Sequence, residues 1–435
     1  MVKRPRVVVV GGGPAGIFAA LKLAKYAQVT LLEKSKNIGG SGLYSDGKIN
    51  FHPQIGGDIS DFVSMDEAWM IVRELEKIFK EFGVEGEYPS DQIEMLLRKA
   101  TSSDIKFIPA KLAHVGSDCL PDLMKKFQKR LEDDGVEIKF QESVVDLRCE
   151  REKVAAVITK NGEVPCDFVL LCPGRSGSFW LREMAEKHNF TFRHNYIDIG
   201  VRVEFSSKVM DEITIDNKIW DPKFHIITPS YDGFVRTFCS NPRGFVTKEA
   251  YGKGLLGVNG HAMKNIHSEN SNFALLNRVN LTHPQEDTTQ YGESIVKLAN
   301  ILGGGKPLLQ RLGDLRKHKR SHWESIKKSN IVPTLKDVTP GDLSMVLPHR
   351  IVVNIIEALE MLDKVMPGVA SNSTLLYAPE VKFYSMRVNV DSNLKTNLDN
   401  LYVAGDGAGL SRGINGAAET GMLAAFGIIE KIKGE

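Results

Sequence analysis

Hydrophobic residues near the N-terminus form a strand, helix, strand pattern. The uninterrupted apolar run at residues 7–10 ends at a glycine, as buried parallel strands often do. A helical repeat follows, with Ile17 and Leu21 on one face, and a second apolar run at residues 29–32 ends in Glu33. The pattern therefore predicts a βαβ unit at the start of the chain.

The hydrophobic pattern changes twice farther along the chain. A helix is predicted at residues 118–130, and a further parallel strand at 136–140. Between 183 and 389, alternating strands surround one long helix, "HRIVVNIIEALEMLD". Strands that alternate in this way are typical of antiparallel sheets, so the interval is predicted to form a mixed, mainly antiparallel α+β domain.

The turn after the first strand is rich in glycine. The spacing G-x-G-x-x-G is met by Gly11, Gly13 and Gly16. In such a turn the first glycine allows a tight bend, the second lets a pyrophosphate approach the backbone, and the third lets the helix pack on the strand. The helix N-terminus attracts phosphate, and Glu33 can accept hydrogen bonds from ribose hydroxyls. This order of elements predicts dinucleotide binding, but it does not separate NAD from FAD.

A second glycine-rich segment lies near the C-terminus. A short strand at residues 401–404 ends in Gly405 and Asp406, and the run 407–416 leads into a helix of small residues. An aspartate beside a helix N-terminus suits a polyhydroxylated chain and an anionic ring edge. The alternative is an ordinary turn in which Asp406 only caps the helix, and the spacing alone leaves both interpretations open.

The stretch "TNLDNLYVAGD" resembles the second FAD fingerprint of the glutathione-reductase-like flavoproteins. Two more stretches resemble this family in the same order: "ESVVDLRCEREKVAAVITKNG", a three-stranded meander, and "DFVLLCPGRSG", a return to the FAD domain. The resemblance implies FAD as cofactor and Asp406 as the contact of the ribityl chain. The cofactor-binding residues expected from the motifs and the resemblance are Gly11, Gly13, Pro14, Ala15, Gly16, Glu33, Lys34, Gly39, Gly40, Ser41, Ser45, Asp46, Gly47, Lys48, Val145, Pro173, Gly174, Gly405, Asp406, Gly413, Ile414, Asn415 and Ala417.

The expected fold class is α/β, a Rossmann-like FAD-binding domain of the glutathione-reductase type with an inserted, mainly antiparallel α+β substrate domain. The expected bounds are 1–57, 104–182 and 390–435 for the FAD-binding domain, 58–103 for a helical insertion, and 183–389 for the substrate domain. A second nucleotide motif is not supported, because the glycines at 303–305 lack a preceding strand and are predicted to be a helix C-cap and turn.

Several internal stretches resemble the uncharacterised FAD-dependent dehydrogenases of bacteria and archaea. They are "GGSGLYSDGKI", "HVGSDCL", "GVRVE", "RTFCSNPRG", "GVNGHAM", "APEVKFYS" and "GDGAGLSRGINGAAETG". The chain departs from this family at Asn241, where a second cysteine is expected shortly after Cys239. This departure disfavours a thiol-based mechanism.

Four residues are candidate catalytic groups. The loop after Glu33 is expected to pass beneath the isoalloxazine, where Lys48 would stabilise the anionic reduced flavin. Arg412 competes for this role, because it immediately precedes the flavin-edge helix. In "PEVKFYSMR", alternation places Lys382 and Tyr384 on one strand face, from which either is expected to orient substrate or exchange a proton. The alternatives are a surface lysine after a turn and an edge strand with solvated charges.

Composition adds limits on partners and location. The 435 residues include 56 Lys and Arg against 54 Asp and Glu, and this balance gives no reason to expect a nucleic-acid partner. The five cysteines have neither C-x-x-C nor metal-ligand spacing, so no metal is expected and the thiols are predicted to be reduced. Apolar runs are too short for a membrane span or a secretory signal, which predicts a cytoplasmic protein without membrane contact.

These observations predict a FAD-dependent oxidoreductase, dehydrogenase-like, that transfers a hydride between a small-molecule substrate and flavin N5. NAD(P)H is one candidate electron donor, visiting transiently, and oxygen or another acceptor would reoxidise the flavin. The alternatives left open are an NAD(P)H-dependent flavin hydroxylase, a flavin-assisted tRNA-modifying enzyme, and a non-catalytic binding protein that keeps the dinucleotide fold. The presence of both Glu33 and Asp406 disfavours a non-catalytic binding protein.

Overall fold

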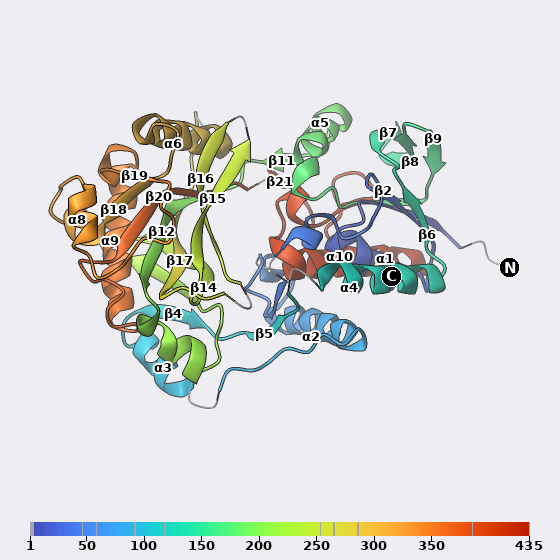
Figure 1. The fold of residues 1–435 in the computed structure, drawn as a ribbon. Helices are drawn as coiled ribbons and strands as arrows, with labels where there is room; N and C mark the ends of the chain where they lie inside the picture. The colour runs from blue at the N-terminus through green and yellow to red at the C-terminus, as the bar shows by residue number, and fades with distance from the viewer. Residues whose placement is uncertain are drawn as a thin grey trace. The chain divides into compact units, whose positions relative to one another are not determined.

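The computed structural model describes residues 4–434 apart from 46, 58, 91–92, 117–118, 253, 264–265, 285–286 and 385. The chain divides into two compact units, whose elements are labelled in Figure 1. Unit 1 comprises Met1–Glu87, Lys111–Asn195 and Tyr384–Glu435, and unit 2 comprises Tyr88–Ala110 and Tyr196–Phe383. Each unit has its own hydrophobic core.

Unit 1 is built on a parallel sheet of five strands in the order β22-β10-β1-β2-β6. These strands are β1 (Arg6–Val10), β2 (Gln28–Glu33), β6 (Glu137–Phe140), β10 (Phe168–Leu171) and β22 (Leu401–Val403). The helices are α1 (Pro14–Leu23), α2 (Met65–Glu81), α4 (Leu120–Asp133), α5 (Ser178–His188) and α10 (Gly413–Lys433). The other strands are β3 (Lys48–Phe51), β5 (Lys111–His114), β7 (Val144–Glu150), β8 (Lys153–Thr159), β9 (Gly162–Pro165), β11 (Phe192–Arg193) and β21 (Arg387–Val388).

The predicted strand, helix, strand unit at the N-terminus is confirmed as β1, α1 and β2. Helix α1 starts with Pro14 at its first position, where a missing N–H costs nothing. It packs against α10 so closely that a Cβ atom placed on Gly421 would lie 2.1 Å from the carbonyl oxygen of Ala15. Figure 1 shows α1, α4 and α10 on one side of the sheet and the predicted three-stranded meander, β7 to β9, on the other.

Unit 2 is built on a sheet of eight strands in the order β19-β18-β20-β12-β17-β14-β13-β4, accompanied by the hairpin β15-β16. Apart from the parallel pair β18 and β19, the pairs are antiparallel, so the predicted mainly antiparallel character is confirmed. The strands are β4 (Ile105–Ile108), β12 (Ile197–Ser206), β13 (Lys223–Thr228), β14 (Gly233–Asn241), β15 (Phe245–Gly252), β16 (Leu255–His261), β17 (Asn270–Val279), β18 (Leu308–Arg311), β19 (Thr339–Pro340) and β20 (Leu375–Lys382). The helices are α3 (Ile93–Thr101), α6 (Thr288–Gly303), α7 (Leu312–Leu315), α8 (Trp323–Lys327) and α9 (His349–Asp363).

The observed units differ from the predicted domain bounds. The expected helical insertion at 58–103 is not one body, because the apolar face of α2 belongs to the core of unit 1 while α3 belongs to unit 2. Strand β4, expected in the FAD-binding domain, instead pairs with β13 in unit 2. The main segment of unit 2 runs from 196 to 383 rather than from 183 to 389. Helix α5 lies in unit 1 because it packs on β7.

Two local predictions can be compared directly with the structure. Helix α6 ends at Gly303 and Gly304 follows in the left-handed region with φ 62°, so the predicted C-cap and turn are confirmed. The strand predicted through "PEVKFYSMR" is wrong beyond Lys382, because β20 ends there and β21 is a separate strand in unit 1. Tyr384 therefore does not share a strand face with Lys382.

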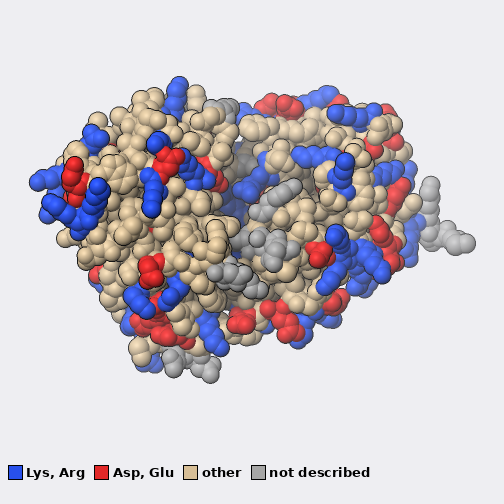
Figure 2. All heavy atoms as spheres, in the orientation of Figure 1, with Lys and Arg blue, Asp and Glu red and all other residues tan. Residues whose placement is uncertain are grey.

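The described residues were searched for membrane-spanning helices and for groups of metal-ligating side chains. None of their helices is long and apolar enough to cross a membrane. No group of three or more His, Cys, Asp or Glu among them is arranged to hold a metal ion. All five cysteines are free thiols. Positive and negative side chains mingle over the face shown in Figure 2.

Candidate functional site

The candidate site begins at the turn between β1 and α1. A Cβ atom on Gly11 would lie 2.2 Å from the carbonyl oxygen of Cys172, and one on Gly16 would lie 1.9 Å from the carbonyl oxygen of Gly11. A Cβ atom on Gly13 would meet nothing within 4 Å. Gly11 and Gly16 therefore allow close packing, whereas Gly13 leaves open space in front of the α1 N-terminus.

Glu33 is fixed at the end of β2 beside this turn, and it is only 5% exposed. Its Oε2 accepts a hydrogen bond from the N–H of Gly12 at 2.7 Å, and its Oε1 accepts from the N–H and hydroxyl of Ser35 at 2.8 and 2.7 Å. The N–H of Glu142 donates to the carbonyl of Glu33 at 2.9 Å, which brings the start of the meander, with the exposed Val145, to the same place. Neighbouring Lys34 donates to Ser176 at 3.1 Å.

The double glycine of the following loop lies directly against the β1–α1 turn. The N–H of Gly39 donates to the carbonyl of Gly12 at 2.6 Å, and a Cβ atom on Gly40 would lie 3.4 Å from the Cα of Gly13. The loop continues through Ser41 as a 3₁₀ turn. The structure therefore brings together two glycine segments that are separated in the sequence by α1 and β2.

The end of this loop forms β3. The hydroxyl of Ser45 accepts from the N–H of Gly47 at 3.1 Å, and Lys48 opens β3 opposite His114 of β5. Asp46 lies outside the described residues. Strand β3 contacts the start of α10, where the side-chain amide of Asn415 donates to the carbonyl of Asn50.

Asp406 lies at the end of β22, close to the N-terminus of α10. Its Oδ1 accepts from the hydroxyl of Ser411 at 2.9 Å and its Oδ2 from the N–H of Gly413 at 3.1 Å. Burial raises the pKa of the Asp406 carboxyl above its usual value, while these two hydrogen bonds and the charges of Arg175 and Arg412 act in the opposite direction. Asp406 is thus half-buried and oriented by the turn that starts α10.

The four segments meet at one edge of the sheet. Because the strands are parallel, the residues after β1, β2, β10 and β22 all lie at their carboxyl ends. The order of strands reverses between β1 and β10. At this point Gly11, after β1, lies against the backbone of Cys172, which is followed by Pro173 and Gly174. The backbone of Gly174 lies against Gly407, since a Cβ atom on Gly407 would be 2.3 Å from the Gly174 carbonyl oxygen. Such a reversal is the usual ligand position in open α/β sheets.

The N-terminus of α10 completes this edge. Its first residues include Gly413, Ile414, Asn415 and Ala417, and its N-cap Arg412 makes no capping hydrogen bond through its side chain. The N–H groups of such a helix end, with its positive dipole, favour a negatively charged group. The arrangement can therefore hold a phosphate at α1 and an anionic ring edge at α10.

Three of the four catalytic candidates lie in unit 1, and Lys382 lies in unit 2. Arg412 and Tyr384 are both in unit 1, and the Arg412 guanidinium lies 3.1 Å from the centre of the Tyr384 ring. Lys48 lies on β3 in the same unit and is half-buried. Lys382 belongs to unit 2, where its Nζ lies 2.9 Å from Glu249 and 3.2 Å from Glu380. These carboxylates hold Lys382 within an ion cluster.

Unit 2 contains a buried polar cluster around Arg202, which sequence reasoning did not identify. Arg202 is fully buried, bonds Glu380 through two nitrogens, and donates to the carbonyl of Cys239 at 2.8 Å and to the side chain of Asn259 at 3.0 Å. These residues come from "GVRVE", "APEVKFYS", "RTFCSNPRG" and "GVNGHAM". Four of the stretches singled out in the sequence therefore meet at one cluster.

A sequence signal for this cluster exists on β12. The apolar residues of this strand alternate with Asp198, Arg202 and Glu204, and the structure buries both faces. Asp198 pairs with Arg236 at 2.7 Å, and Glu204 accepts from Tyr377 at 2.5 Å. Three charged residues within one strongly apolar strand indicate a buried polar layer when the strand lies at the centre of a sheet.

Two family models match the chain. "FAD dependent oxidoreductase" matches residues 6–170, and "FAD-dependent protein, C-terminal domain-like" matches residues 196–383, the main segment of unit 2. A Clostridium beijerinckii protein with the name "Uncharacterized protein" is 26% identical over 453 residues, covering 98% of this chain and 81% of its own length. The chain belongs to the FAD-dependent oxidoreductases, and its cofactor is FAD.

The chain was also compared with solved structures. L-proline dehydrogenase from P. horikoshii has a TM-score of 0.43 at 12% identity, with 100% of this chain and 95% of that chain covered. The p-nitrophenol 4-monooxygenase from Pseudomonas putida has a TM-score of 0.40 at 13% identity, with 100% and 82% covered. Similarities of this size are too low to assign a reaction.

The residues at the sheet edge fit FAD. The open space at Gly13 gives a pyrophosphate access to the N–H groups of α1, which a side chain there would obstruct. Glu33 and Asp406 are both held by backbone N–H groups, so their carboxylates are oriented before any ligand is present. The chain therefore has suitable groups for the phosphate, ribose and ribityl parts of the cofactor.

Proposed function

We propose that the protein is a dehydrogenase-like flavoprotein of the glutathione-reductase type that transfers a hydride between a small-molecule substrate and flavin N5. The observation that carries this proposal is the meeting of Gly13, Glu33, Asp406 and the α10 N-terminus at the carboxyl edge of one parallel sheet. A protein that had kept only the fold would not need two carboxylates oriented at this edge.

Each segment has a distinct role in this proposal. The α1 N-terminus binds the pyrophosphate through its N–H groups, and Gly40, which lies against Gly13, closes over it. Glu33 accepts hydrogen bonds from the ribose of the adenosine half, while backbone groups at Val145 contact the adenine. Asp406 accepts from the ribityl chain, and the α10 N-terminus faces the N1–C2=O edge of the ring.

The bound flavin supplies the hydride acceptor or donor. Lys48 and Arg412 are proposed to stabilise negative charge at the N1–C2=O edge, because a cation in a poorly solvated pocket favours the reduced anion. Tyr384 positions Arg412 through the contact between its ring and the guanidinium. For Lys382 we propose a structural role, because Glu249 and Glu380 already hold its ammonium group.

The test is anaerobic reduction of the FAD-loaded protein, followed at the visible absorption band of the flavin. NADH, NADPH and a panel of small metabolites are added separately, with dithionite as the positive control. Bleaching by at least one metabolite or nicotinamide is expected. If dithionite bleaches the band and no biological reductant does at high concentration, the dehydrogenase proposal is wrong, although FAD binding stands.

The same samples in air distinguish the hydroxylase alternative. Rapid NAD(P)H oxidation that starts only when a substrate is added would replace the dehydrogenase proposal by hydroxylation. Salt-dependent binding of tRNA would instead favour the tRNA-modifying alternative, because phosphate contacts weaken steeply with ionic strength. Neither behaviour is expected for a cytoplasmic dehydrogenase acting on a small molecule.

A further inference from the structure

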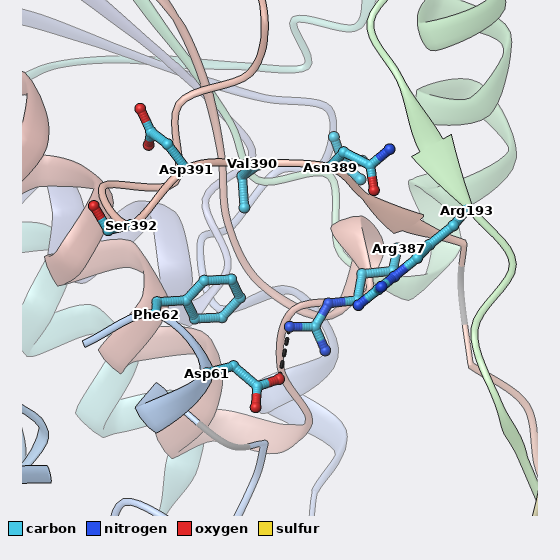
Figure 3. Close-up of a pocket in the computed structure, with 9 residues that line it drawn as sticks. Asp61, Phe62, Arg193, Arg387, Asn389, Val390, Asp391 and Ser392 are labelled. Atoms are coloured by element: carbon cyan, nitrogen blue, oxygen red, sulfur yellow. Dashed lines mark hydrogen bonds and ion pairs between the residues drawn. The ribbon is translucent and has the colours of Figure 1, made fainter. Parts of the chain in front are cut away.

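A polar cavity lies in unit 1, beside the two-stranded antiparallel pair β11 and β21. It is a cavity of about 330 Å³, near the lower end of the range for small-molecule sites. The lining residues come from three segments and are shown in Figure 3: Asp61, Phe62, Arg193, Arg387, Val388, Asn389, Val390, Asp391 and Ser392. All of them belong to unit 1.

Two arginines on paired strands line this cavity. Arg193 of β11 is the direct antiparallel partner of Arg387 of β21, and Figure 3 labels both among the residues that line the cavity. Like charges directly opposite each other on paired strands are destabilising. The pair is therefore unfavourable unless nearby negative charge compensates both guanidinium groups.

The protein compensates only one of the two. Arg387 pairs with Asp61 at 2.7 Å and stacks over the ring of Phe62 at 5.2 Å. Arg193 is exposed and makes no side-chain hydrogen bond or ion pair with the residues that the structure describes. The arginine pair thus retains a guanidinium that can bind a ligand.

The second carboxylate in the lining, that of Asp391, does not neutralise Arg193. Oδ1 of Asp391 accepts from the N–H groups of Asn393 and Lys395, both at 2.9 Å, and so stabilises its own turn. Figure 3 shows the carboxylate of Asp391 directed away from the two arginines. The positive charge near Arg193 is consequently not neutralised from this side.

We propose that this cavity binds a small organic anion through Arg193 and Arg387. The planar guanidinium group matches carboxylate and phosphate oxygens with two parallel hydrogen bonds, so these are the two anionic groups that fit. Phe62 and Val390 provide apolar walls next to the arginines. The ligand class is therefore a small molecule with a carboxylate or phosphate on a short apolar body.

The cavity adjoins the turn that carries Asp406. A Cβ atom on Gly409 would lie 2.2 Å from the carbonyl oxygen of Met386 and 3.0 Å from the Cα of Arg387, so these backbones are in direct contact. If Asp406 holds the flavin, as the proposed function states, the anion binds one backbone segment away from the cofactor turn. This last step rests on the proposed function, whereas anion binding itself does not.

The test is calorimetric titration of the FAD-loaded protein at low ionic strength with inorganic phosphate, acetate and, as a neutral control, acetamide. Saturable binding of one phosphate or acetate per chain is expected, and none of acetamide. Tighter phosphate binding would identify a phosphate ligand, and tighter acetate binding a carboxylate ligand. If neither anion gives a saturable isotherm, the proposal is wrong, and the flavin reduction experiment is unaffected.

Three variants assign the binding to the cavity. Arg193→Gln should weaken binding at least about tenfold, because a bidentate charged contact is lost. Asp61→Asn should strengthen it, because Arg387 is released from its carboxylate partner. The matched control Arg151→Gln removes an exposed arginine of the same unit and should leave the affinity unchanged. Equal affinities in Arg193→Gln and the unaltered protein, with the same flavin spectrum, would overturn the proposal.

Discussion

The guanidinium of Arg202 is held by the carboxylate of Glu380, with Nε 2.7 Å from Oε2 and Nη2 2.5 Å from Oε1, and neither side chain is exposed. Burial disfavours the charge, but the negative groups around it, Glu380 above all, outweigh this effect and raise the pKa of Arg202 above its usual value. The ion pair connects two neighbouring strands of the unit 2 sheet, because Arg202 is on β12 and Glu380 is on β20.

We expect Glu380→Gln to destabilise unit 2 by about 3–5 kcal/mol, because it leaves a buried guanidinium without its counter-charge. The free energy of unfolding is measured by urea titration with circular dichroism. The control Glu249→Gln removes a partly exposed partner of Lys382 and should cost less, of the order of 1 kcal/mol. A loss below about 1 kcal/mol for Glu380→Gln would mean that water or neighbouring amides replace the carboxylate.

The parts of the structure that could be predicted from sequence are those fixed by local pattern. The glycine spacing and the apolar run specify β1, α1 and β2, because turn geometry and strand burial both leave a signal within thirty positions. The same holds for the capped end of α6 at Gly304. Asp406 could be placed at a strand end for this reason, but its hydrogen bonds with Ser411 and Gly413 could not be predicted.

The parts that could not be predicted depend on pairing between distant strands. Alternation in "PEVKFYSMR" continues past Lys382, yet β20 ends there because the chain passes from unit 2 to unit 1. The charged positions of β12 look like a solvated face until Glu380 and Asn259 are brought to Arg202 by other strands. Strand β4 carries no sign in its own sequence that its partner is β13.

Substitutions of two glycines in the first turn are expected to have different effects, one on FAD binding and the other on stability. Gly13→Ala is expected to fold normally, since its Cβ meets nothing within 4 Å, but to weaken FAD binding by placing a methyl group where the pyrophosphate lies. Gly16→Ala is expected to lower the stability of the apoprotein, because its Cβ would lie 1.9 Å from the carbonyl oxygen of Gly11. Thermal unfolding and FAD titration measure the two effects. The same FAD affinity in Gly13→Ala and the unaltered protein would place the phosphates elsewhere.

Asp406→Ala should lose most of its bound flavin during purification, because the carboxylate proposed to hold the ribityl chain is removed. The loss is measured as the ratio of flavin to protein absorbance, with thermal unfolding as a check of the fold. The control Ser411→Ala removes a hydroxyl that bonds Asp406 without, in the proposed site, touching flavin, and should retain more cofactor. Tight stoichiometric FAD in Asp406→Ala would show that the ribityl contact is misplaced.

Glu419 provides a test of pH dependence. It lies in α10 with 2% exposure, and its Oε1 has no hydrogen-bond partner in the part of the chain that the structure describes. Burial raises the pKa of this carboxyl from 4.5 to about 8. The folded protein therefore keeps a proton that the unfolded chain releases, so stability falls as pH rises from 4.5 and levels off above about 8.

Glu419→Gln should remove this slope, because the amide stays neutral at every pH. The variant is expected to be more stable than the unaltered protein by roughly 1–3 kcal/mol near neutral pH, with the difference shrinking as the solution is acidified. Urea unfolding at a series of pH values gives the two curves. The control Glu183→Gln replaces an exposed carboxylate of α5 and should follow the unaltered protein. A difference between Glu419→Gln and the unaltered protein that does not change with pH would mean that the Glu419 carboxyl is already ionised in the folded state.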